Sequence, residues 1–249
     1  MEPSWLAERL GGPDVRVVDL READAYEQSH LPGAVQLDLA DLGTSHGGRD
    51  NVLLPPAAFA ALMESLGIDN QCSVVAYDDQ WGLAAARLVW ALHFHGHASA
   101  AVLDGGWDRW REEGRLVTDR PAPPGPSRFE AIPNPEVGAE LAWLSERIPG
   151  EEPRLLDTRT QVEFDQGHLP GAILWDWFNA VPPDSWDCTR EPEELRAEWG
   201  ELGVDPSREI VVYCRSGMRA AHTYVALKHA GYPRVRLYDG SWQEWSMSV

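Results

Sequence analysis

The chain has 249 residues, of which 43% are hydrophobic and 24% are charged, so it can bury a core and carry a polar surface in one large or two ordinary domains. Its formal net charge of -19 repels phosphate backbones and anionic lipid headgroups, so we expect neither nucleic acid nor a membrane as a partner. The sequence lacks the apolar run of about 18 residues that a spanning helix requires and the basic start and apolar stretch of a secretory signal, so we expect a cytoplasmic protein.

The sequence contains one pattern twice. A D-x-R motif occurs at Asp19 and again at Asp157, and the motif HLPGA occurs at His30 and again at His168. In each copy a second block follows: SVVAY, a helical pattern and VLDGGWDRW in the first, and EIVVY, a helical pattern and LYDGSWQEW in the second. Because the order of the blocks is the same, we infer that a whole domain is duplicated.

The stretch between the two copies is rich in proline. Six prolines lie between Thr118 and Glu136, and proline removes backbone donors and favours an extended, semi-rigid chain. We therefore predict an N-terminal domain at 1–120, a linker at 121–136 and a C-terminal domain at 137–249.

Within the second copy, strand and helix patterns alternate. We predict strands at 154–157, 172–177, 209–213 and 235–240, and helices at 161–166, 191–204, 218–230 and 241–245. Pro192 and Gly203 mark the two ends of the longest polar helix. Such alternation predicts a parallel sheet with helices on both faces, in which ligand sites gather at the carboxyl ends of the strands.

Cys214 lies at such a strand end, in the sequence VVYCRSGMRAAH. A helix start after Gly217 directs N–H groups and a positive dipole toward the loop, and Arg215 and Arg219 add positive charge. These features favour a thiolate and an incoming anion. A redox thiol and a buried structural cysteine are the alternatives, but two arginines beside a buried structural thiol would be costly.

Taken together, these motifs resemble the tandem-domain rhodanese family, which includes thiosulfate and 3-mercaptopyruvate sulfurtransferases, and the resemblance covers nearly the whole chain. The motifs that carry it are D-x-R with EF-x-x-GHLPGA, the loop CRSGMRA and the closing DGSWQEW, in this order. The resemblance implies two tandem rhodanese-like α/β domains, each a mainly parallel sheet with helices on both faces. It also implies an enzyme that needs no metal or organic cofactor.

The reaction implied by the resemblance is sulfur transfer. The Cys214 thiolate would attack the outer sulfur of a small anionic donor, thiosulfate first among them, hold it as a persulfide, and pass it to cyanide or a thiol. Its loop amides would stabilise charge on the sulfur, and its arginines would orient the donor. The expected substrate-binding residues are Arg215, Ser216, Gly217, Met218, Arg219, Ala220, Arg159 and Trp177.

In the first copy the corresponding loop is different. It carries DDQW from Asp78 to Trp81 where the second carries CRSG from Cys214. An aspartate cannot hold a persulfide, so we predict a catalytically inactive N-terminal domain, as is usual for the family, that packs against the second domain and walls the site.

The donor stays open because the second loop also departs from the family. CRSGMR matches neither CRKGVT of the thiosulfate enzymes nor CGSGVT of the mercaptopyruvate enzymes. Glu163 stands where the long tandem enzymes place a further donor-binding arginine, so we expect its charge to weaken the binding of anionic donors.

Other candidates have a structural interpretation. Arg159, as part of the D-x-R motif, is more often one half of an ion pair that organises loops. His168 could be a general base, but its counterpart His30 lies in the inactive copy, which favours a structural role. Trp175 and Trp177 follow a strand end and are candidates to line the mouth of a pocket.

The remaining cysteines are expected to be incidental. Cys72 begins a strand pattern, and Cys188 lies in a polar loop where we expect more exposure. The three cysteines form neither a CxxC pair nor a cluster with histidines, so we expect no metal site.

Two other functions stay possible. One is a relay or binding module that receives its persulfide from a protein. The other is a cysteine-dependent phosphatase or arsenate reductase, but those loops place five residues between cysteine and arginine, whereas Ala220 occupies that arginine position here. We expect a monomer, because the duplication already supplies a domain interface.

Overall fold

The computed structural model describes residues 1–148, 150 and 152–248. It forms two compact units, each containing one copy of the repeat. Unit 1 consists of Met1–Thr44, Leu53–Pro133 and Pro183–Cys188, and unit 2 of Ser45–Val52, Asn134–Pro182 and Thr189–Val249. Each unit therefore includes a short segment from the other half of the sequence, which the repeat did not reveal, and the predicted boundaries at 120 and 137 stay predictions.

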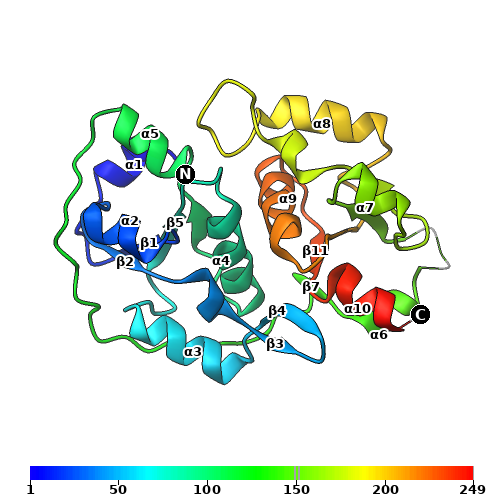
Figure 1. The fold of residues 1–249 in the computed structure, drawn as a ribbon, viewed down its shortest axis with the longest axis horizontal. Helices are drawn as coiled ribbons and strands as arrows, with labels where there is room; N and C mark the ends of the chain where they lie inside the picture. Colours follow the sequence, from blue (N-terminus) through cyan, green and yellow to red (C-terminus); the bar gives the residue numbers. More distant parts are fainter. Residues whose placement is uncertain (149, 151, 249) are drawn as a thin grey trace. The chain divides into compact units, whose positions relative to one another are not determined.

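Unit 1 is built on a four-stranded parallel sheet in the order β2-β1-β5-β6 (Figure 1). Its strands are β1 (Val15–Asp19), β2 (Ala34–Gln36), β5 (Ser73–Tyr77) and β6 (Ala100–Val102). Its helices are α1 (Pro3–Ala7), α2 (Ala23–Gln28), η1 (Leu39–Leu42), α3 (Pro56–Ser65), α4 (Leu83–Phe94) and α5 (Gly106–Glu112). A separate hairpin is formed by β3 (Gly43–His46) and β4 (Arg49–Leu53), and its residues Ser45–Val52 belong to unit 2.

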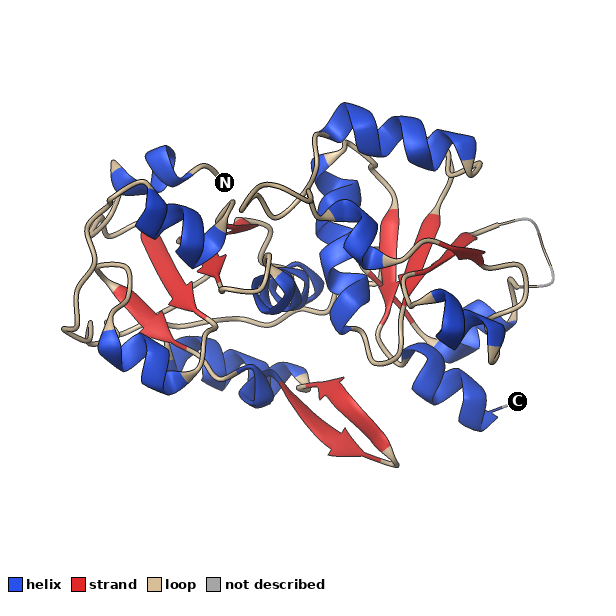
Figure 2. Cartoon of the chain, turned by 45° about the horizontal axis from the view of Figure 1, so that its top comes forward, coloured by secondary structure: helices blue, strands red, loops and turns tan. Residues whose placement is uncertain are grey.

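Unit 2 repeats this plan with one more strand, in the order β7-β11-β10-β8-β9, again parallel. Its strands are β7 (Gly138–Ala139), β8 (Arg154–Asp157), β9 (Ile173–Leu174), β10 (Ile210–Tyr213) and β11 (Val235–Tyr238). Its helices are α6 (Leu141–Ser145), α7 (Gln161–Asp165), η2 (Trp177–Ala180), α8 (Pro192–Glu201), α9 (Met218–His229) and α10 (Ser241–Ser248). Figure 2 shows helices on both sides of the strands, so the predicted α/β fold class is confirmed.

The two cores use matching positions. Val17 faces Val75 across β1 and β5, and Leu155 faces Val211 across β8 and β10. All four side chains are buried, and each such burial contributes about 1.5–3 kcal/mol before conformational entropy is subtracted. The apolar strand patterns therefore specify the two sheets.

Two strand predictions were too long. The run at 235–240 forms β11 only at Val235–Tyr238. The run at 172–177 forms only β9 (Ile173–Leu174), because Asp176 accepts a hydrogen bond from the Phe178 N–H at 3.1 Å and caps the 3-10 helix η2. Trp177 therefore begins this helix instead of ending the strand.

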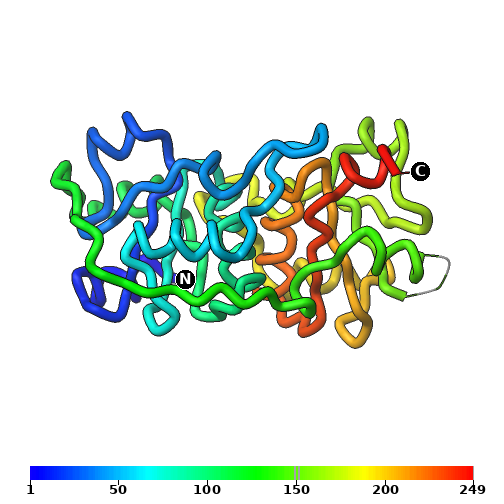
Figure 3. The backbone as a smooth tube through the Cα atoms, turned by 90° about the horizontal axis from the view of Figure 1, so that it is seen from below, coloured from blue at the N-terminus to red at the C-terminus, as the bar shows by residue number. Residues whose placement is uncertain are grey.

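The proline-rich stretch at 121–134 contains no helix or strand, and Figure 3 shows it as an extended green trace. Every helix in the described part of the chain is too short or too polar to cross a membrane.

Candidate active site

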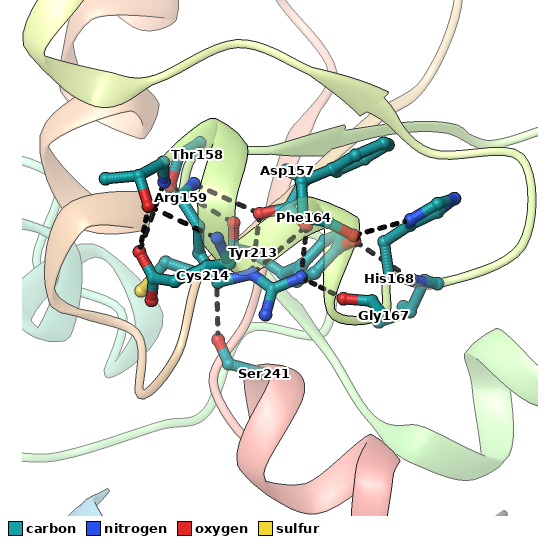
Figure 4. A network of polar contacts seen from close by, with 12 residues as sticks. Asp157, Thr158, Arg159, Phe164, Gly167, His168, Tyr213, Cys214 and Ser241 are labelled. Atoms are coloured by element: carbon teal, nitrogen blue, oxygen red, sulfur yellow. Dashed lines mark hydrogen bonds and ion pairs between the residues drawn. The ribbon is translucent and has the colours of Figure 1, made fainter.

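The carboxyl end of β8 carries a buried ion pair (Figure 4). The Arg159 guanidinium donates to both carboxylate oxygens of Asp157, at 2.7 and 2.9 Å, and to the Gly167 carbonyl at 2.7 Å. The Tyr213 hydroxyl accepts the Leu169 N–H at 3.0 Å, and burial together with Asp157 raises the pKa of this tyrosine. These contacts join β8, β10 and the GHLPGA turn. The charges of Asp157 and Arg159 compensate each other.

Unit 1 contains the same network. Arg21 donates to Asp19 at 2.6 and 3.0 Å and to the Ser29 carbonyl at 2.7 Å, and the Tyr77 hydroxyl accepts the Leu31 N–H at 3.2 Å. Because this network also occurs in the unit that lacks the cysteine, it is not specific to the cysteine-bearing unit. These contacts favour a structural role for the D-x-R motif, and direct donor binding by Arg159 stays a prediction.

His168 lies at the start of the same turn. Its ring stacks on Phe164 with the centroids 3.7 Å apart, and its Nδ1 lies 3.0 Å from the Phe164 carbonyl oxygen. His30 makes the same two contacts with Tyr26 in unit 1, at 3.9 and 2.8 Å. The geometry agrees with the structural interpretation of this histidine.

Cys214 follows β10 directly and is 1% exposed. Gly217, with φ at +84°, precedes the first helical residue of α9, Met218, so the loop turns sharply into the helix start. The backbone N–H groups of a first helical turn have no partner within the helix and are available to an anion. The structure thus places the predicted loop, from Cys214 to Ala220, at the carboxyl edge of the sheet.

The start of α10 contacts this loop through several hydrogen bonds. The Ser241 hydroxyl accepts the Cys214 N–H at 3.2 Å and donates to the Tyr238 carbonyl at 2.8 Å. The Trp242 N–H donates to the Cys214 carbonyl at 3.0 Å, and the Gln243 N–H donates to the Arg215 carbonyl at 3.1 Å. Two loop carbonyls are therefore fixed against α10. The DGSWQEW motif therefore helps to fix the cysteine loop through backbone contacts, which could not be predicted from the sequence.

The equivalent loop of unit 1 cradles a carboxylate. Asp78 is 2% exposed, and its oxygens accept the N–H groups of Gln80 and Gly82, each at 2.8 Å, and of Ala85 at 2.9 Å. Burial raises the pKa of Asp78, and the loop amides oppose that shift. A loop of this design therefore converges several N–H groups on one anionic side chain.

The structure also corrects the alignment of the two loops. Gly82, with φ at +80°, precedes α4 as Gly217 precedes α9. Trp81 is therefore an additional residue, with φ at +55°, and it is not the counterpart of Gly217. The loop of unit 1 is therefore one residue longer than that of unit 2. This insertion was not apparent from a residue-by-residue comparison of the two sequences.

The Arg219 side chain is not a free cation. It donates from both terminal nitrogens to the two Glu163 oxygens, each at 2.7 Å. Burial lowers the pKa of Arg219, but Glu163 and Cys214 together raise it above its ordinary value. The Arg219 hydrogen bonds, with help from Thr160, lower the pKa of Glu163 to about 2. The predicted unfavourable charge of Glu163 is thus compensated within the site.

Ser216 and Arg215 occupy the outer part of the loop. Arg215 is exposed. The Ser216 hydroxyl accepts from the Asn51 amide at 3.3 Å, and Asn51 lies on the Ser45–Val52 segment that belongs to unit 2. This segment is further held by Arg49, which donates to Glu244 at 2.5 Å. Asn51 was not identified from the sequence as a neighbour of Ser216, because no local pattern in the hairpin indicates a partner so distant in the chain.

The two candidate tryptophans occupy different environments. Trp177 is half-buried at the start of η2, and its ring meets the His222 ring edge to face, with the centroids 5.1 Å apart. Trp175 is 2% exposed and donates its indole N–H to Glu198 at 2.8 Å. Trp175 is therefore a core residue, and the prediction that it lines a pocket mouth is wrong.

The other cysteines are buried. Cys188 packs in unit 1, where its N–H donates to Asp104 at 3.0 Å, so the expectation of an exposed thiol is wrong. Burial raises the pKa of Cys188 and that of Cys72. Among the described residues, no group of His, Cys, Asp and Glu has the arrangement of a metal site.

Comparisons with known proteins agree with the repeat. The family model for the rhodanese-like domain matches residues 2–113 and again 140–248. Sulfur carrier protein TtuD of Thermus thermophilus is 36% identical, over 98% of this chain and 92% of that protein. Thiosulfate sulfurtransferase of Bos taurus is 34% identical, over 97% of this chain and 89% of that protein.

The fold comparison gives the same result. The crystal structure of SseA from Escherichia coli, which is described as a 3-mercaptopyruvate sulfotransferase, superposes with a TM-score of 0.88 at 27% identity and covers 97% of this chain and 98% of that one. The chain therefore belongs to the rhodanese family, as a tandem-domain, thiosulfate sulfurtransferase-like transferase.

Proposed function

We propose that the protein transfers a sulfane sulfur from a small anionic donor, with thiosulfate as the first candidate, through a persulfide on Cys214. The acceptor is cyanide or a thiol. In the first step the Cys214 thiolate attacks the outer sulfur of thiosulfate, the bond between the two thiosulfate sulfurs breaks, and sulfite leaves with the bonding electron pair. In the second step the acceptor attacks the outer sulfur of the persulfide and Cys214 leaves as a thiolate.

The observation that carries this proposal is the anion cradle of unit 1. Its loop amides surround a carboxylate on Asp78, and the equivalent loop of unit 2 presents a thiol at the same position. A persulfide anion on Cys214 would meet the same kind of cradle, from Ser216 to Ala220. Backbone amides fixed in this way stabilise developing charge without reorganising.

A second candidate is a relay that receives its sulfur from a protein partner. The similarity to a protein named a sulfur carrier favours it, as does the engagement of Arg219 with Glu163, which leaves fewer free cations for a small oxyanion. In either case Cys214 carries the sulfur.

Mass spectrometry of the intact protein tests the proposal. Incubation with thiosulfate should add about 32 Da, the mass of one sulfur atom, to the wild type. Cys214→Ala should show no gain, and Cys188→Ala, which removes a buried thiol from unit 1, should keep it. Later addition of cyanide should remove the added mass and release thiocyanate.

The outcomes separate the candidates. A gain that persists in Cys214→Ala would contradict the assignment of the carrier. No gain with thiosulfate or mercaptopyruvate, but a gain with a persulfidated protein, would establish the relay instead of the small-donor enzyme.

A further inference from the structure

We propose that Glu163 is a specificity-determining residue, which disfavours doubly charged sulfur donors such as thiosulfate relative to singly charged persulfides carried on uncharged thiols. This inference rests on the proposed function of Cys214 and names the class of donor that its site selects.

The first observation is the geometry of the ion pair. Arg219 lies on the first turn of α9 and interacts electrostatically with Cys214, yet both of its terminal nitrogens donate to Glu163. A fork of this kind uses both terminal nitrogens of the planar guanidinium. A donor that needs Arg219 must therefore compete with Glu163 for the same N–H groups.

The second observation is that Glu163 is anchored. It forms a capping box at the start of α7, in which its carboxylate accepts the Thr160 N–H at 3.1 Å and the Thr160 hydroxyl at 2.9 Å. It cannot swing away from Arg219 when a donor arrives without breaking this cap. The carboxylate is thus part of the site and does not act as a mobile surface charge.

The third observation concerns charge and exposure. The Glu163 side chain is 29% exposed and the Arg219 side chain 21%, so the pair lies where an incoming donor and water can both reach it. Removing the carboxylate charge would leave Arg219 uncompensated beside the sulfur. With solvent screening, one unit of protein charge acting on each donor charge corresponds to about a threefold change in affinity, so the two charges of thiosulfate give about tenfold in total.

The variant Glu163→Gln tests this directly. Glutamine serves as well as glutamate in a capping box, so the start of α7 should be kept, and circular dichroism and thermal unfolding would verify that the fold is retained. The matched control is Glu193→Gln, which removes one carboxylate from another Glu–Arg pair, that with Arg196 at 2.5 Å on α8. Both variants change the net charge equally.

Sulfur transfer to Cys214 would be measured with two donors, thiosulfate and the persulfide of 2-mercaptoethanol. For Glu163→Gln we expect kcat/KM for thiosulfate to rise by about tenfold, mainly through a lower KM. The value for the persulfide should rise by only about threefold, because that donor carries one charge where thiosulfate carries two. Glu193→Gln should leave both values unchanged.

Equal changes for the two donors, or a fall for thiosulfate, would overturn the inference, because Glu163 would then act only by holding the loop in place. That failure is distinct from failure of the proposed function itself. If neither donor adds sulfur to the wild type, or if the sulfur is not on Cys214, the persulfide mechanism is wrong.

Discussion

A buried histidine makes the stability of unit 1 sensitive to acid. His95, at the end of α4, is 1% exposed, and its ring stacks on Phe59 with the centroids 4.2 Å apart. Burial lowers the pKa of His95 to about 4, whereas an unfolded histidine titrates near 6.5. The unfolded chain therefore binds more protons between these values, so the free energy of unfolding must fall as the pH drops from about 6.5 toward 4.

The size of the effect follows from the two pKa values. Between pH 8 and pH 5 the difference amounts to about 2 kcal/mol of unfolding free energy from His95 alone. The variant His95→Phe keeps an aromatic ring against Phe59 but cannot be protonated. Its free energy of unfolding should therefore fall by about 2 kcal/mol less than that of the wild type over this interval. Burial also lowers the pKa of His97, but His97 contributes equally to both proteins.

Urea unfolding at pH 8 and pH 5, followed by tryptophan fluorescence and far-ultraviolet circular dichroism, measures this difference. If the wild type and His95→Phe lose the same stability between the two pH values, the neutral buried histidine does not account for the acid sensitivity.

Two further predictions concern the loop of unit 1. Asp78→Asn should reduce the free energy of unfolding by about 2 kcal/mol in urea titrations, because its new NH2 group would face amides that now donate to a carboxylate; an unchanged midpoint would show that these amides are satisfied in another way. Gly82→Ala should cost about 2–4 kcal/mol, since φ is +80° and a Cβ would lie 2.9 Å from Val102 and 3.0 Å from Cys188. Gly114→Ala, with φ at +66° and no atom within 4 Å of a Cβ, is its control and should cost about 1 kcal/mol; equal losses for the two variants would contradict the crowding argument.

Much of the fold could be predicted from local patterns. Short apolar runs such as Val211–Tyr213 predict strands, and the capping residues around α8 mark its ends within a few residues. The position of Cys214 also follows from the sequence, because the residue after a parallel strand lies at the carboxyl edge of the sheet.

The partners of the charged residues could not be predicted in this way. Local patterns specify that Arg219 lies on the first turn of a helix, but they do not specify which carboxylate reaches it. Glu163 reaches it because α7 starts beside that turn. The sequence suggested an uncompensated charge, and the fold supplies a compensated pair.

The repeat determined the duplicated α/β architecture, the membership of the rhodanese family and the one loop with a cysteine in place of the aspartate. Only the tertiary structure decided that Arg219 is shared with Glu163, that Cys188 and Trp175 are buried, and that the Ser45–Val52 hairpin belongs to unit 2. The physical reason is one of range. Periodicity and capping act over a few residues, whereas an ion pair or a buried contact depends on where separate loops meet in space.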